Sequence, residues 1–203
     1  MADEARLILA SGSAVRRAML AAAGVDVEIR PADIDEHAIR DRMLAADPDV
    51  SHESIAGALA AEKAQAVSRN APRAVVIGAD QVLSFEGRML NKPASIAEAR
   101  AQLLALRGKA HALHSAVALA RGGTVLWRHT ATAHLRFRAF SETALEAYLA
   151  RAGDVVMTSV GAYQVEGPAI QLFETIDGDH TTILGMPLLP LLAELRRREV
   201  LLT

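Results

Sequence analysis

The central stretch of the sequence is Ala74-Val75-Val76-Ile77-Gly78-Ala79-Asp80, an apolar run that ends on a carboxylate. A strand with one buried face alternates apolar and polar residues, so an unbroken apolar run indicates a strand covered on both faces. The run therefore predicts an α/β protein in which helices flank a sheet. Asp80 would stand at the carboxyl end of this strand, where α/β proteins place their binding sites.

Strand and helix patterns alternate ahead of this run. We expect a short buried strand over residues 7–10, followed by a loop and an alanine-rich helix that ends at Gly24. Alternating apolar side chains predict a half-buried strand over residues 25–29. Apolar residues at helical spacing predict a second helix over residues 53–69. The first third of the chain is thus built from strand and helix units.

The second half of the sequence predicts a long β-hairpin. Residues 111–119 and 124–137 are extended segments joined at Gly122-Gly123, and a shorter hairpin turns at Gly87. Further helices are expected over residues 95–106, about 142–150 and 187–198. Since the sequence has no repeat and no linker, we expect one domain over residues 1–203, with a mixed β-sheet and helices on its flanks.

The composition is that of an ordinary globular chain, because 51% of the 203 residues are hydrophobic and 23% are charged. With a net charge of -2, no overall field would hold the chain on nucleic acid or on an anionic membrane. Cysteine is absent, which excludes disulfides and a cysteine nucleophile and agrees with a reducing compartment. The acidic start Met1-Ala2-Asp3-Glu4 lacks the features of a signal peptide, so we expect a cytoplasmic protein with no membrane partner.

The loop after the first strand is a candidate anion site. It contains Ser11, Gly12 and Ser13, and Arg16 and Arg17 follow at the start of the helix. Free backbone N–H groups and the helix dipole favour an anion at such a position, and arginine can grip phosphate oxygens in pairs. The alternative is structural: Ser13 caps the helix and the arginines lie on a solvated face.

Two carboxylates are candidate ligands of a hard metal ion. Asp80 follows an apolar strand, where an unpaired charge is costly, so it should face a cleft, be paired, or bind a metal. Glu36, in the acidic stretch 33–36, is a possible second ligand, and two carboxylates plus phosphates suit Mg²⁺ or Mn²⁺. Alternatively, Asp80 forms a structural ion pair with a lysine and Glu36 belongs to an ordinary acidic turn.

Lys63 and Lys92 are cations whose functional interpretation depends on their reaching the same phosphates, since each alone is typical of a protein surface. The histidines lack metal-ligand spacing, as the pair His111 and His114 would lie on opposite faces of a strand. The sequence also lacks the P-loop, nucleophile-elbow and H-E-x-x-H motifs. The residues alone therefore predict a site for an anion and a metal ion. They do not show which bond of a substrate the site would break.

The whole set of motifs resembles the Maf, or septum-formation-inhibitor-like, nucleotide pyrophosphatases. The matching segments are Leu9-Ala10-Ser11-Gly12-Ser13 with Arg16, Ile34-Asp35-Glu36, Glu62-Lys63-Ala64, Gly78-Ala79-Asp80-Gln81, Lys92-Pro93, Leu106-Arg107-Gly108-Lys109 with His111, Gly161-Ala162-Tyr163 up to Gly167, and Gly185-Met186-Pro187-Leu188. Each segment alone is a weak indication, but the ordered set is specific because it extends over nearly the whole chain.

This resemblance implies a Maf/ITPase-like α/β fold with a long mixed sheet and a deep central cleft, often in a homodimer. It implies hydrolysis of a nucleoside triphosphate to a monophosphate and pyrophosphate with a divalent metal cation, Mg²⁺ or Mn²⁺. The implied roles are phosphate binding for Ser11, Ser13 and Arg16, charge stabilisation for Lys63 and Lys92, and metal binding for Glu36 and Asp80. Asp80 would also be the base that orients water.

Several positions bear on the choice of base. Ala14 stands where the family usually has proline, Val15 where many members have arginine, and Glu166 where many have glutamine. Gln81 follows Asp80, where the branch that acts on dTTP and UTP usually has threonine. Gln81 and Glu166 thus become candidate substrate-binding residues, and the pattern is more similar to the branch that acts on 7-methyl-GTP.

Two alternative functions remain at this stage. The first is a nucleotide-binding regulator of cell division with incidental hydrolysis, which the family's older name suggests. The second is a phosphatase that removes the terminal phosphate, and it would release orthophosphate where a pyrophosphatase releases pyrophosphate.

Overall fold

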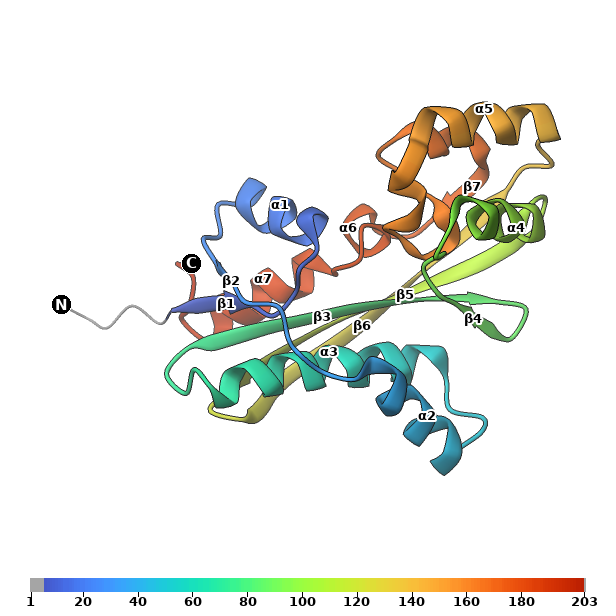
Figure 1. The fold of residues 1–203 in the computed structure, drawn as a ribbon. Helices are drawn as coiled ribbons and strands as arrows, with labels where there is room; N and C mark the ends of the chain where they lie inside the picture. Colours follow the sequence, from blue (N-terminus) through green and yellow to red (C-terminus); the bar gives the residue numbers. More distant parts are fainter. Residues whose placement is uncertain (1–5, 203) are drawn as a thin grey trace.

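A seven-stranded sheet of mixed direction runs through the protein, seen in a computed structural model that describes residues 6–202 (Figure 1). The acidic start at residues 1–4 lies outside the described part. The strand order is β2-β1-β3-β5-β6-β7, and β4 pairs with β3 off this path. The strands are β1 (Leu7–Leu9), β2 (Glu28–Ile29), β3 (Val75–Phe85), β4 (Arg88–Leu90), β5 (Ala110–Arg121), β6 (Thr124–Phe137) and β7 (Phe173–Asp177).

Helices cover both faces of this sheet, as the apolar run at its centre predicts. They are α1 (Ala14–Ala22), α2 (Glu36–Ala46), α3 (His52–Arg69), α4 (Ile96–Leu106), α5 (Glu142–Ala152), α6 (His180–Ile183) and α7 (Leu188–Arg197). Three short 3-10 turns lie between α5 and β7. Within the described residues, every helix is too short or too polar to span a bilayer.

Most of the predicted elements are confirmed. The helices expected over residues 53–69, 95–106, 142–150 and 187–198 appear as α3, α4, α5 and α7, and the long hairpin appears as β5 and β6. Gly24 has a φ of 72° just after α1, the left-handed conformation that ends a helix and that glycine adopts at low cost.

Two expectations need correction, and one helix was not predicted. The strand predicted over residues 25–29 is reduced to Glu28–Ile29. Helix α2 has no clear pattern in the sequence because Ile39 is its one buried residue. Strand β3 does not end at Asp80 but continues to Phe85, so the carboxylate lies in mid-strand.

Asp80 nevertheless lies at a break in strand pairing. One edge of β3 pairs with β5 from Val76 to Ser84. The other edge pairs with β1 at residues 75–77 and with β4 at residues 83–85, which leaves residues 78–82 without a neighbouring strand. The middle of β3 is therefore accessible to groups from other elements, as an edge strand would be.

Different helices pack against the two faces of β3. Val76 and Val82 pack with Leu59 of α3, whereas Val75 and Ile77 pack with side chains of α1 and α7. Figure 1 shows α3 on one side of the sheet and α1, α6 and α7 on the other. Because successive side chains of a strand point to opposite faces, neighbouring residues in the open stretch point into different layers.

Gly78 lets α3 approach the sheet very closely. A Cβ at this position would lie 2.0 Å from the carbonyl oxygen of Ala60 and 2.7 Å from the amide nitrogen of Ala64. Both are backbone atoms of α3, so a side chain at position 78 can be accommodated only if the whole helix moves away. The missing side chain at position 78 thus sets the distance between α3 and the strand that carries Asp80.

We predict that Gly78→Ala lowers the free energy of unfolding by about 3 kcal/mol, because α3 must move away from β3. Gly57→Ala is the matched control on α3, since its Cβ would lie 3.4 Å from the Thr130 side-chain oxygen. It should change stability by less than about 1 kcal/mol. Urea unfolding of both variants checks this, and equal stabilities would show that the close approach is not a constraint.

Candidate active site

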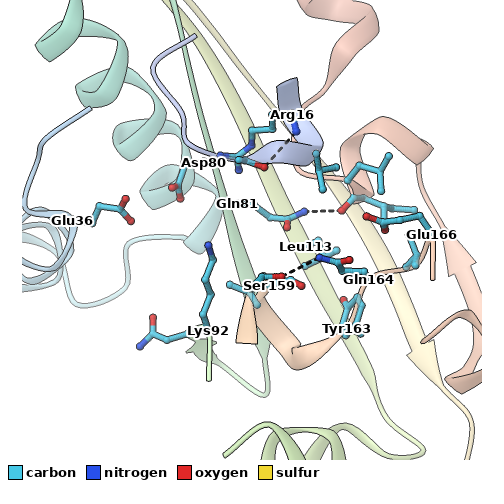
Figure 2. Close-up of a pocket in the computed structure, with 18 of the residues that line it drawn as sticks. Arg16, Glu36, Asp80, Gln81, Lys92, Leu113, Ser159, Tyr163, Gln164 and Glu166 are labelled. Atoms are coloured by element: carbon cyan, nitrogen blue, oxygen red, sulfur yellow. Dashed lines mark hydrogen bonds between the residues drawn. The ribbon is translucent and has the colours of Figure 1, made fainter. Parts of the chain in front are cut away.

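A cavity of about 580 Å³ lies where β3 lacks a neighbouring strand. Eight of the nine predicted site residues line it, so the separate segments converge as expected. These eight are Ser13, Arg16, Glu36, Lys63, Asp80, Gln81, Lys92 and Glu166. Figure 2 shows Glu36 on one side of the cavity, Gln164 and Glu166 on the other, and Asp80, Gln81 and Lys92 between them.

The loop between β1 and α1 has both a structural and a cavity-lining role. Ser13 is the N-cap of α1, and its side-chain oxygen accepts a hydrogen bond from the backbone N–H of Arg16. Ser13 also lines the cavity, so capping and access to a ligand coexist in one residue. Ser11 is buried and does not line the cavity, and Arg17 is exposed away from it. A direct phosphate contact by Ser11 stays a prediction.

Arg16 is held in place by protein oxygens. Its Nε donates to the Gly185 carbonyl at 2.9 Å, and its Nη1 donates to Ser11 Oγ at 3.1 Å and to the Ala79 carbonyl at 2.9 Å. Burial lowers the pKa of its guanidinium, while nearby Asp80 acts in the opposite direction. Arg16 thus joins α1 to the open edge of β3, and the donors of its Nη2 are the ones left for a ligand.

One lysine holds the two predicted metal carboxylates together. Lys63 Nζ lies 2.6 Å from Asp80 Oδ1 and 2.7 Å from Glu36 Oε1, and the lysine side chain is 11% exposed. Burial would raise the pKa of Glu36, but its bond to the Lys63 ammonium holds the pKa below the ordinary value. The ion pair that was the structural alternative for Asp80 therefore exists, and it lies inside the cavity.

The second oxygen of Asp80 fits a metal ligand. Asp80 Oδ2 is buried and has no hydrogen-bond partner among the described residues. Such an atom is costly unless a ligand or water pairs with it. Residues 6–202 contain no cluster of three or more His, Cys, Asp or Glu side chains that could hold a metal. Two carboxylates suit an ion such as Mg²⁺, which takes its other ligands from water and phosphate.

Lys92 approaches this group from a different segment. It follows β4 in a turn fixed by Pro93, which is buried, and Figure 2 shows its side chain extending toward Asp80. Its positive charge contributes to the lowered pKa of Glu36. Cations from α3 and from the turn after β4 thus meet carboxylates from α2 and β3 at one end of the cavity.

The other end of the cavity lies on the opposite face of β3. Gln81 points to this face, where its Nε2 donates to Ser115 Oγ at 2.9 Å and to the Ile183 carbonyl at 2.9 Å. Because the donors of this amide are used by the protein, its oxygen is left to face a ligand. Glu166 adds a carboxylate from the segment between α5 and β7. This end therefore presents hydrogen-bond acceptors.

A buried aromatic pair supports this wall. Tyr163 lines the cavity, and its hydroxyl lies 2.7 Å from His111 Nε2. Burial lowers the pKa of His111 to about 4 and raises that of Tyr163 well above its ordinary value. Both side chains are neutral near pH 7, and they pack around Phe137 and Phe173. His111 thus belongs to the core, as its lack of metal spacing predicts.

The cavity also has lining residues that sequence patterns did not single out, chiefly Arg40, Asn91 and Gln164. Arg40 lies four residues after Glu36 on α2, so the two side chains share one face of the helix. Recognising α2 from the sequence would have pointed to Arg40. Asn91 and Gln164 lie in irregular segments, where no periodicity indicates the direction of a side chain.

Comparison with known proteins identifies close relatives. The family model described as "Maf-like protein" matches residues 6–198. A Brucella suis protein named "7-methyl-GTP pyrophosphatase" is 50% identical over 194 residues, covering 96% of each chain. A Mesorhizobium japonicum protein with the same name is 50% identical and covers 94% of this chain and 95% of its own. A Granulibacter bethesdensis protein named "Nucleoside triphosphate pyrophosphatase" is 48% identical, covering 97% and 98%.

The pKa of His111 predicts a pH dependence of stability. Its folded pKa of about 4 lies below the ordinary 6.5, so its contribution is complete above pH 6.5 and is lost as pH falls toward 4. We expect wild type to lose about 2 to 3 kcal/mol more than His111→Gln between pH 7.5 and 4.5. Urea unfolding at both pH values measures this, with His180→Gln as an exposed control. Equal losses in all three proteins would refute it.

Proposed function

The chain belongs to the Maf-like protein family, and from this premise we propose how its cavity hydrolyses a nucleotide. The chain is a nucleoside-triphosphate pyrophosphatase, an enzyme that breaks the bond between the α- and β-phosphates. The observation that carries the proposed mechanism is the ion-paired group of Lys63, Asp80 and Glu36, which shares one cavity with the N-terminus of α1. Cations, carboxylates and free N–H groups are the components that phosphoryl transfer needs.

We propose that the substrate lies across the open edge of β3. The base would lie by Gln81 and Glu166, and the triphosphate would extend past the N-terminus of α1 toward Glu36 and Lys92. The reacting α-phosphate would then lie near Asp80, between these ends. This orientation places anionic phosphates beside cations and leaves the hydrogen-bond acceptors of the cavity for the base.

We propose that Asp80 and Glu36 hold a divalent cation, Mg²⁺ or Mn²⁺, when nucleotide binds. Such an ion would neutralise phosphate charge and make a bound water more acidic. The buried, unpartnered Oδ2 of Asp80 supports this assignment. Lys63 would hold both carboxylates in place, since its ammonium contacts each of them.

The proposed reaction is an in-line displacement at the α-phosphorus. A water oxygen forms a bond to this phosphorus, the bond to the α–β bridging oxygen breaks, and pyrophosphate leaves. Asp80 orients the water and takes up its proton. Lys63 and Lys92 stabilise the negative charge that develops on the phosphate oxygens. Lys63 is already held in position by its two carboxylate partners.

We further propose that the base is a guanine methylated at N7. The oxygen of Gln81 and the carboxylate of Glu166 are acceptors, whereas the N1–H and N2 amino groups of guanine are donors. Methylation at N7 places positive charge on the ring, which a carboxylate favours. Uracil offers one donor between two carbonyl oxygens and fits such a site less well. Dimer formation and a cytoplasmic location stay predictions.

Substitution of Asp80, the proposed general base, and of Lys92, the cation in the turn after β4, tests the mechanism. We expect Asp80→Asn and Lys92→Ala each to lower kcat by roughly 10²-fold or more, because each removes an interaction that strengthens in the transition state. Pyrophosphate release from nucleoside triphosphates, with Mg²⁺ or Mn²⁺ and with EDTA, is the measurement.

The matched controls are Asp41→Asn and Lys109→Ala, which lie outside the cavity. Activity of Asp80→Asn within twofold of these controls would remove it from the mechanism. Orthophosphate as the product would favour a phosphatase instead, and tight nucleotide binding without turnover would favour a regulator of cell division.

The substitution Glu166→Gln tests the proposed preference for a methylated guanine base. We expect wild type to prefer 7-methyl-GTP over UTP by about 10²-fold or more in kcat/KM, because unpaired acceptors penalise the wrong base. The variant should lose about 10-fold or more in kcat/KM for 7-methyl-GTP and change little for UTP. A screen of ordinary and methylated triphosphates measures both. Equal losses for the two substrates would rule out a role in base selection.

A further inference from the structure

The guanidinium of Arg40 lines the cavity and makes few hydrogen bonds within the protein. Its side chain is 17% exposed, yet its Nε is buried and has no hydrogen-bond partner among the described residues. Its Nη1 donates to Asn91 Oδ1 at 2.9 Å. Its Nη2 lies 3.7 Å from Glu36 Oε2, which is too long for a hydrogen bond. The second N–H of Nη1 and both N–H groups of Nη2 are therefore left for a ligand.

The other cations of the cavity are differently placed. Its described lining contains four lysine and arginine side chains, which are Arg16, Arg40, Lys63 and Lys92. Arg16 is engaged by three protein oxygens, and Lys63 is engaged by two carboxylates. Arg16 keeps only the two donors of its Nη2, whereas Arg40 makes a single hydrogen bond. Arg40 and Lys92 therefore have the most donors to spare among these described lining cations, and both lie at the Glu36 end of the cavity.

We propose that Arg40 binds the β- and γ-phosphates of the substrate and the pyrophosphate that leaves, an inference that rests on the proposed function. The planar guanidinium can donate two parallel hydrogen bonds to phosphate oxygens, which matches a group with several oxygens close together. Burial strengthens such bonds because the local dielectric is low. Arg40 thus selects a substrate with a pyrophosphate leaving group over one with a single terminal phosphate.

Asn91 is the positioning residue for Arg40. Its side-chain oxygen orients the guanidinium, and its own backbone carbonyl accepts a hydrogen bond from Gln102 of α4 at 3.0 Å. Lys92 follows directly in the chain, so α2 is tied to the segment that carries the second available cation. Arg40 and Lys92 would therefore approach the leaving group from two sides.

Binding of inorganic pyrophosphate to the nucleotide-free protein tests this role directly. Calorimetric titration, with Mg²⁺ and with EDTA, compares wild type with Arg40→Ala, Arg40→Lys and Arg42→Ala, an exposed control on α2. We expect the Kd to rise about 10- to 100-fold in Arg40→Ala, less in Arg40→Lys, and less than twofold in Arg42→Ala. Asn91→Ala should weaken binding in the same direction by a smaller factor.

Kinetics separate this role from general damage to the site. Arg40→Ala should raise KM for a nucleoside triphosphate about 10-fold or more and weaken inhibition by the matching diphosphate much less. Inhibition by the nucleoside monophosphate should be unchanged, because that product does not reach Arg40. A merely structural role would weaken all three ligands together.

The proposal is overturned if Arg40→Ala binds pyrophosphate as tightly as Arg42→Ala does, or if it loses monophosphate and pyrophosphate affinity equally. If Arg40→Ala does not fold, Arg40→Lys and Asn91→Ala give the same comparison. Failure of the proposed function would appear differently, as wild-type protein that releases no pyrophosphate from any nucleotide. Wild-type turnover combined with unchanged pyrophosphate binding in the Arg40 variants therefore refutes the role of Arg40 alone.

Discussion

The structure depends on the contact of one ammonium group with two carboxylates. Lys63 of α3 lies within hydrogen-bonding distance of Asp80 in β3 and of Glu36 at the start of α2. A carboxylate in mid-strand would destabilise the fold if it were unpaired, so Asp80 requires a cation from the helix that packs on its face of the sheet. Gly78 permits that pairing, since a side chain there would push α3 away from the strand. Stability and chemistry thus impose the same distance between α3 and β3.

The interrupted pairing of β3 explains how one cavity can perform two tasks. Asp80 and Gln81 are neighbours in sequence, and their side chains point to opposite faces of the sheet. In a fully paired strand they would be separated by the sheet itself. Because β1 and β4 leave residues 78–82 open, the cavity reaches both faces. Charged groups for phosphates and acceptors for a base can therefore act on a single substrate.

Two arginines of the cavity illustrate how burial and partners decide a role. The family resemblance implies phosphate binding for Arg16. Its Nε and Nη1 already donate to Gly185, Ala79 and Ser11, which leaves the donors of Nη2 for a ligand. Arg40 is not predicted by any sequence pattern, and with a single hydrogen bond it has more donors left over than Arg16 does. Residue type predicts which ions a side chain can bind, whereas its neighbours decide whether it is free to bind them.

The sequence by itself determined the α/β class, most helices and the long hairpin, because these follow from local periodicity, caps and turns. It also determined eight of the residues that line the cavity, through motifs in a specific order. Tertiary structure alone decided that β3 runs on past Asp80, that Lys63 is shared by two acids, and that Arg40 faces the cavity beside Asn91. These features arise from contacts between segments far apart in the chain, and local patterns carry no information about such distances.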